Sequence, residues 1–228
     1  MNPTTELIKR RIAGSIAALE ALRRDAATIA ACIDALVGTI RAGGLIATCG
    51  NGGSAAEALH LSEELLGRYR SARSGLRSAC LAADPTALTC IANDFGFEEV
   101  FARQARALLR PGDALVAFST SGRSPNILRA LEAARALGAM TVGFLGGDGG
   151  PAHALCDHAV VVPVADSAHV QEAHQVLLHL LCEALEPIEP GAPVGPGSPL
   201  RPVGAACSAP MDAPPIAATR PPSGGATE

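Results

Sequence analysis

Apolar residues in the first forty positions recur at helical spacing. Ile8, Ile12 and Ile16 fall on one face of a helix, and a second series with the same period begins at Ile29. The pattern predicts two helices within residues 4–42, which we interpret as a helical hairpin. Its apolar surface is larger than one layer of strands can cover, so the hairpin is suited to packing against another subunit.

From Gly44 onward, short apolar runs alternate with longer amphipathic segments. The runs predict strands over residues 45–49, 78–82, 114–119, 140–145 and 159–163. The amphipathic segments predict helices over residues 54–68, 85–93, 97–109, 124–137 and 167–186. Strands that alternate with helices form a parallel sheet with helices on both faces. We therefore expect a doubly wound α/β fold with a five-stranded parallel sheet, in which ligands bind at the carboxyl ends of the strands.

The pattern ends where the composition changes. Residues 187–228 hold eleven of the seventeen prolines, interleaved with Gly, Ala and Ser, and have no periodic apolar positions. Such a segment cannot offset its ordering entropy by burial, so we expect a disordered tail. The sequence thus divides into a helical hairpin (1–43), an α/β domain (44–186) and this tail.

The amino-acid composition argues against several classes of protein. The net charge is −4 and the 18 Lys and Arg residues are scattered, so we expect no nucleic-acid surface. We expect no signal peptide and no membrane segment, because no apolar run reaches the roughly 18 residues that a spanning helix needs. The seven cysteines are an odd number without a CxxC pair, which argues against a disulfide framework and a cysteine zinc site. A cytoplasmic protein with reduced thiols is expected.

Two loops have the residues expected of an anion-binding site. The sequence Gly-Asn-Gly-Gly-Ser at 50–54 joins a predicted strand to a helix, and we expect Ser54 at the N-cap, where backbone amides and the helix N-terminus attract negative charge. Residues 119–124, Ser-Thr-Ser-Gly-Arg-Ser, stand in the same setting before Pro125. Either loop alone fits ordinary capping equally well. Two such loops in one parallel sheet favour a sugar-phosphate site. Neither loop has the glycine spacing of a Walker motif or of a dinucleotide-binding motif, so no nucleotide cofactor is expected.

Acid/base or metal-binding side chains follow on two helices. His60 and Glu64 are four residues apart and share a helix face. Gln171, Gln175 and His179 form a polar stripe on the otherwise Leu-rich last helix, which is costly to bury unless it is paired or functional. Taken alone, His179 fits a satisfied interface histidine better than a catalyst. Three other histidines are interpreted as facing solvent: His153, His158 and His169.

These motifs occur together in one known family. The matching residues are Glu64 and the segments 49–60, 67–69, 93–96, 119–126 and 170–179. They resemble the phosphoheptose isomerases, which are sugar isomerase (SIS) domain proteins, and the resemblance extends to about Glu186. It implies a flavodoxin-like subunit, a homotetramer with active sites at subunit interfaces, and conversion of sedoheptulose 7-phosphate to D-glycero-D-manno-heptose 7-phosphate. That reaction is the first step toward nucleotide-activated heptoses.

The resemblance also implies roles for individual residues. Glu64 is the base that moves a proton between C1 and C2 through an enediol, and His179 is its acid/base partner. The residues that match substrate-binding positions are Asn51, Gly52, Gly53, Ser54, Arg68, Asn93, Asp94, Ser119, Thr120, Ser121, Ser124 and Gln171. Some members bind zinc through residues that match His60, Glu64, Gln171 and His179, so one zinc per subunit is expected. Ala168 and His169 depart from the family, in which many members have Asp and a basic residue there.

Two expectations about the assembled protein remain. We expect Glu64 and His179 of one active site to come from different subunits, since each is flanked by apolar residues that need burial. Close relatives offer a second function class, namely non-catalytic SIS-domain proteins that associate with a replication initiator or sense sugar phosphates. A pure binding protein has no need of both Glu64 and His179, so the sequence favours the enzyme.

Overall fold

The computed structural model of the chain describes residues 2–186, and the predicted tail lies outside them. The strands are β1 (Ile46–Gly50), β2 (Ser78–Cys80), β3 (Ala114–Ser119), β4 (Met140–Gly146) and β5 (His158–Val162). The helices are α1 (Pro3–Arg24), α2 (Ala26–Arg41), α3 (Gly53–Leu66), α4 (Pro85–Phe95), the short 3-10 helix η1 (Phe97–Glu99), α5 (Ala102–Leu108), α6 (Pro125–Ala136), α7 (Gly150–His153) and α8 (Ser167–Leu185).

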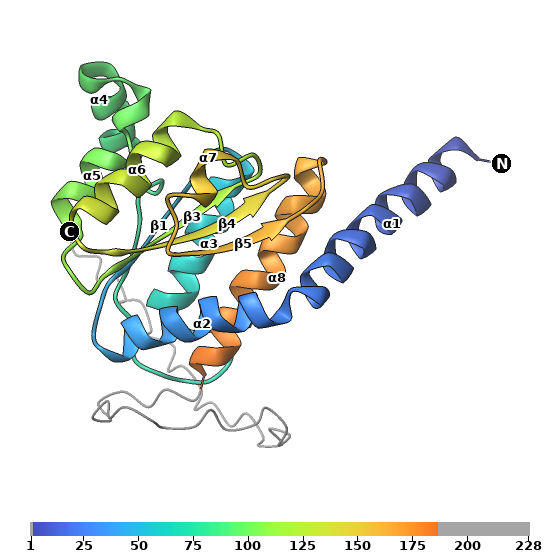
Figure 1. Cartoon of the computed structure of the whole chain (residues 1–228), viewed down its shortest axis with the longest axis horizontal. Coiled ribbons are helices and arrows are strands. Elements are labelled where there is room, and N and C mark those ends of the chain that lie inside the picture. Colours follow the sequence, from blue (N-terminus) through green and yellow to red (C-terminus); the bar gives the residue numbers. More distant parts are fainter. Residues whose placement is uncertain (1, 187–228) are drawn as a thin grey trace, which may run out of the picture. The chain divides into compact units, whose positions relative to one another are not determined.

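The five strands form one parallel sheet in the order β2-β1-β3-β4-β5. Alternate residues of each strand enter different cores. Val116 and Phe118 pack with α2, α3 and α8, whereas Leu115 and Ala117 pack with α5 and α6 on the other face (Figure 1). Strands buried on both faces explain the continuous apolar runs in the sequence. The expected α/β fold with a five-stranded parallel sheet is confirmed.

The two leading helices are present, but they diverge instead of folding back on one another. Only Asp25 separates them, which is too short for an antiparallel turn, and α1 extends away from the sheet (Figure 1). Helix α1 buries Ala18, Ala21 and Leu22 near its C-terminal end. Three apolar side chains nearer its N-terminus are more than half exposed: Ile8, Ile12 and Ile16.

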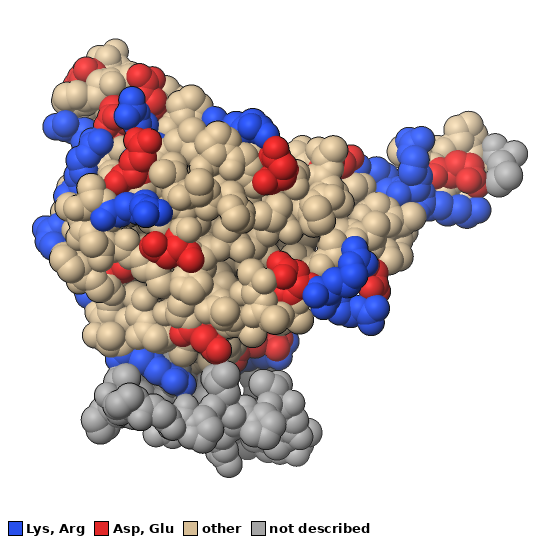
Figure 2. All heavy atoms as spheres, viewed as in Figure 1, with Lys and Arg blue, Asp and Glu red and all other residues tan. Residues whose placement is uncertain are grey.

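Several boundaries differ from the predicted ones. The predicted helix over 97–109 is divided into η1 and α5, and β1 begins and ends one residue later than predicted. Helix α7 was not predicted, because four residues are too few to show a helical period. Within residues 2–186, no helix combines the length and apolar character required to cross a bilayer. Acidic and basic side chains are interspersed on the face shown in Figure 2.

Candidate active site

The Gly-rich loop joins the end of β1 to α3. Gly52 occupies the N-cap with φ 55° and ψ −122°, a conformation that an L-residue rarely adopts. Ser54, which we expected at the N-cap, instead lies in the first turn of α3 and is buried. The positive φ at Gly52 starts the helix at Gly53, so the N-cap lies two residues earlier than expected. The amides of Gly52 and Gly53 therefore stand at the positive end of α3.

The Ser-rich loop joins the end of β3 to α6. The hydroxyl oxygen of Ser119 accepts from the Gly122 amide at 3.0 Å, and that of Ser121 accepts from the Arg123 amide at 3.3 Å. These two side chains shape the turn. Ser124 is the N-cap residue of α6, yet its hydroxyl makes no capping hydrogen bond. It remains available to a ligand.

A reciprocal amide pair connects the two loops. Asn51 donates to Asn126 Oδ1 at 2.9 Å, and Asn126 donates back to Asn51 Oδ1 at 2.8 Å. Because β1 and β3 are neighbours in the sheet, both loops leave the same edge. Sequence reasoning assigned no role to Asn126, although a buried Asn in the first turn of a helix after a Ser-rich loop was a usable signal. The two candidate phosphate loops thus form one unit.

The acid/base candidates come together between α3 and α8. His60 Nε2 lies 3.3 Å from Glu64 Oε1, and the rings of His60 and His179 meet edge to face with centroids 5.2 Å apart. One ligand atom from each of these three residues lies within 4.8 Å of the other two. All three belong to one chain, so the expectation that Glu64 and His179 come from different subunits is wrong. Helix α8 packs directly on α3, which the sequence pattern could not show.

Two imidazoles and a carboxylate are ligand types that zinc prefers, and this cluster fits such an ion. The fourth predicted ligand, Gln171, belongs to α8, and its side-chain amide lies against Gly53 at the N-terminal end of α3. A Cβ atom added at position 53 would overlap this amide. Gly53 therefore allows α8 to approach the Gly-rich loop closely. No hydrogen bond joins Gln171 to the three clustered residues within the described chain.

Comparisons with known proteins show the family to which the chain belongs. A family model described as SIS domain matches residues 12–146. A phosphoheptose isomerase of Trichlorobacter lovleyi is 44% identical over 160 residues, covering 70% of this chain and 82% of that protein. One from Pelobacter propionicus is 43% identical over 184 residues, covering 80% and 95%. The chain belongs to the phosphoheptose isomerase family of SIS domain proteins.

A solved structure supports the same assignment. The phosphoheptose isomerase of Neisseria gonorrhoeae superposes with a TM-score of 0.76 at 35% identity, covering 81% of this chain and all of that one. The resemblance inferred from the motifs is therefore confirmed.

Three predicted substrate residues do not reach the loops within the chain. Arg68 is exposed and donates to the Arg70 carbonyl oxygen at 3.2 Å. Asn93 and Asp94, at the exposed end of α4, are hydrogen-bonded to each other at 2.7 Å. Within residues 2–186, none of the three exchanges a hydrogen bond with either loop.

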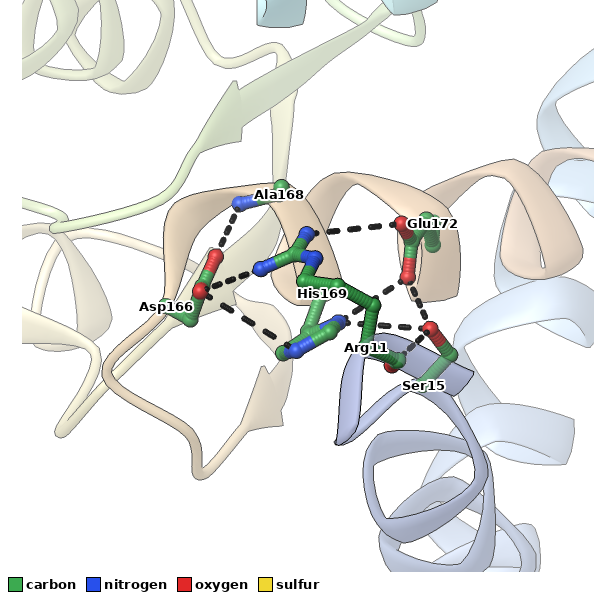
Figure 3. Close-up of polar contacts among 6 residues, drawn as sticks. All are labelled: Arg11, Ser15, Asp166, Ala168, His169 and Glu172. Carbon is green, nitrogen blue, oxygen red and sulfur yellow. Dashed lines mark hydrogen bonds and ion pairs between the residues drawn. The ribbon is translucent and has the colours of Figure 1, made fainter. Parts of the chain in front are cut away.

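His169, which we interpreted as facing solvent, is buried against α1. Figure 3 shows its ring beside Ser15 and Glu172, with Nδ1 3.3 Å from the Ser15 hydroxyl and 3.1 Å from Glu172 Oε2. Arg11 binds Asp166 Oδ2 at 2.6 Å in the same cluster. The α8 segment that contains Ala168 and His169 thus attaches to α1.

Hydrogen bonds lower two pKa values in this cluster. The Ala168 amide, with help from Arg11, holds the pKa of Asp166 below its ordinary value. The Ser15 hydroxyl and then His169 do the same for the pKa of Glu172. Both carboxylates are therefore charged at neutral pH.

A second pair, missed by sequence reasoning, lies beneath the site. Glu57 on α3 and His174 on α8 are almost fully buried, with Glu57 Oε2 3.5 Å from His174 Nδ1. The His174 ring also lies against Phe118 and Phe144 of the sheet. Glu57 shares the apolar face of α3 with Leu61, which is the signal that could have identified it. The pair links the two helices that carry the acid/base residues.

Proposed function

We propose that the chain is an aldose–ketose isomerase that converts sedoheptulose 7-phosphate to D-glycero-D-manno-heptose 7-phosphate. The observation that carries this proposal is the cluster of Glu64 and His179 between α3 and α8, with the paired phosphate loops at the N-terminal end of α3. The substrate is inferred from the relatives, which are named phosphoheptose isomerases. The non-catalytic binding protein is not favoured, because it needs no such acid/base pair.

The proposed chemistry moves one proton between carbons and one between oxygens. The amides and hydroxyls of residues 52–54 and 119–124 bind the phosphate and fix the sugar. Glu64 removes a proton from C1 of the open-chain ketose, and the electron pair forms the C1–C2 double bond of an enediol. His179 gives a proton to O2 and accepts one from O1. Glu64 then returns its proton to C2, which yields the aldose without any redox partner.

We also propose one zinc ion per subunit, held by His60, Glu64, Gln171 and His179. Support comes from the three clustered side chains, whose atoms are of the types that zinc binds. When bound, zinc would stabilise negative charge that develops on the sugar oxygens. Zinc-affinity measurements on the purified protein test this part of the proposal separately from turnover.

The reaction is tested with purified protein, sedoheptulose 7-phosphate and added zinc. Aldoheptose phosphate should form without a nucleotide. In heavy water, deuterium should appear at C2 in the fraction of turnovers in which the proton on Glu64 exchanges with solvent before it is returned. Glu64→Gln and His179→Ala should each lower kcat by about 10²–10⁴-fold, the usual effect of losing a positioned acid or base. Glu63→Gln is the matched control, since Glu63 is exposed on α3 and is not one of the clustered residues. No turnover by the folded, zinc-supplied wild type would favour the binding protein.

We further propose a homotetramer located in the cytoplasm. Support for self-association comes from apolar side chains of α1 that are 38–55% exposed in the single chain: Leu7, Ile8, Ile12, Ile16 and Leu19. In the tetramer, Arg68, Asn93 and Asp94 would reach the sugar from a neighbouring subunit. Light scattering should give about four times the 23.0 kDa chain mass, and Ile12→Asp should lower it. The odd number of cysteines, without a CxxC pair in the sequence, supports the cytoplasmic location.

A further inference from the structure

Gln175 makes a contact that the proposed ligand set does not explain. It lies on α8 one turn after Gln171 and one turn before His179. Its side-chain oxygen Oε1 is 3.0 Å from His60 Nδ1 on α3. An amide oxygen can only accept a hydrogen bond, so Nδ1 of His60 carries a proton in this arrangement.

The other nitrogen of the same ring points to the acid/base cluster. His60 Nε2 lies 3.3 Å from Glu64 Oε1. With the proton on Nδ1, a neutral His60 presents the lone pair of Nε2 to a carboxylate oxygen. Two acceptors this close repel one another unless a metal ion or a proton on Nε2 lies between them. The contact to Gln175 therefore selects the ring nitrogen that faces the ion site.

We propose that Gln175 is a positioning residue that holds His60 in the Nδ1–H tautomer, so that Nε2 is the atom offered to zinc. The inference rests on the proposed zinc site and adds a residue outside its ligand set. The side chain of His60 is about one third exposed, so burial alone does not fix the ring. A hydrogen-bond acceptor behind a metal-binding histidine fixes both its orientation and its tautomer.

The test compares two substitutions in the full-length protein. Gln175→Met keeps the length of the side chain and removes the acceptor. Zinc affinity, measured by competition with a chromophoric chelator, should fall by about 10–100-fold, as is usual when such a partner is lost. Gln175→Glu restores an acceptor of similar length, so its zinc affinity should equal or exceed that of the wild type.

Gln104→Met is the matched control. The Gln104 amide on α5 donates to the carbonyl oxygens of Leu81 and Val100 at 2.9 and 2.7 Å, on the other face of the sheet. Its loss should leave zinc affinity unchanged. If Gln175→Met does not fold, Gln175→Leu serves as a second acceptor-free variant, with circular dichroism as the check.

The outcomes separate this inference from the proposed function. Unchanged zinc affinity in the acceptor-free variant overturns the inference. An equal fall in zinc affinity in Gln175→Met and Gln175→Glu also overturns it, because the amide would then act only through packing. A wild type that isomerises the sugar but binds no zinc overturns the inference and leaves the isomerase proposal intact. A wild type that binds zinc but turns over no substrate overturns the proposed function, while the affinity comparison still decides the role of Gln175.

Discussion

The buried pair of Glu57 and His174 gives the sharpest prediction about stability. Their side chains are only 3% and 0% exposed, and the polar atoms of both lack a hydrogen-bond partner within the described chain. Replacing one partner leaves the other buried and uncompensated, which costs about 3–5 kcal/mol. Replacing both with apolar residues of similar size is often close to neutral.

We therefore expect strong coupling in a double-mutant cycle. Glu57→Met and His174→Leu should each destabilise the protein by about 3 kcal/mol, which corresponds to a fall in melting temperature of roughly 6–12 °C for a chain of this size. The double variant should lose about 2 kcal/mol or less. The coupling energy is then about 4 kcal/mol, most of which reflects the unpaired group in each single variant.

The assay is denaturant and thermal unfolding at one fixed protein concentration, because the stability of the proposed oligomer would depend on concentration. The exposed pair Arg129 and Glu132, whose atoms lie 3.3 Å apart, is a matched control that should couple by less than about 1 kcal/mol. A double variant as unstable as the two single variants added together would refute the reasoning. It would mean that the pair contributes through shape alone.

Three further predictions follow from particular contacts. Mixing Glu64→Gln with His179→Ala after subunit exchange should restore no activity, because both residues of a site belong to one chain; recovery would contradict the geometry. Glu172→Gln should destabilise the protein at neutral pH. Because the folded-state pKa of Glu172 lies below the ordinary 4.5, this difference should disappear as the pH falls through that lower value, and a difference that persists in acid would argue against the cluster on α1. Gly122→Ala should cost more than about 1 kcal/mol and raise KM, since Gly122 has φ +61° and a Cβ would overlap the Gly149 carbonyl oxygen; an unchanged melting temperature would count against this.

The sequence by itself determined the features that depend on near neighbours along the chain. Continuous apolar runs identified the strands, because a parallel strand buried on both faces has no polar positions. The Gly-rich and Ser-rich turns identified both loops, and the four-residue spacing of His60 and Glu64 placed them on one helix face. These features need only local geometry, so each was predicted in place, apart from shifts of one or two residues at the element ends.

Only the tertiary structure decided which distant residues meet. The period of α8 shows that it buries a face, but not that this face packs on α3 and places His179 beside Glu64, 115 residues earlier in the chain. The same limit explains His169, whose partners belong to α1, and Glu57, whose partner belongs to α8. The periodic spacing of apolar residues indicates that a side chain is buried. Its partner is set by the order of the strands and the packing of helices across the sheet, which no local pattern encodes.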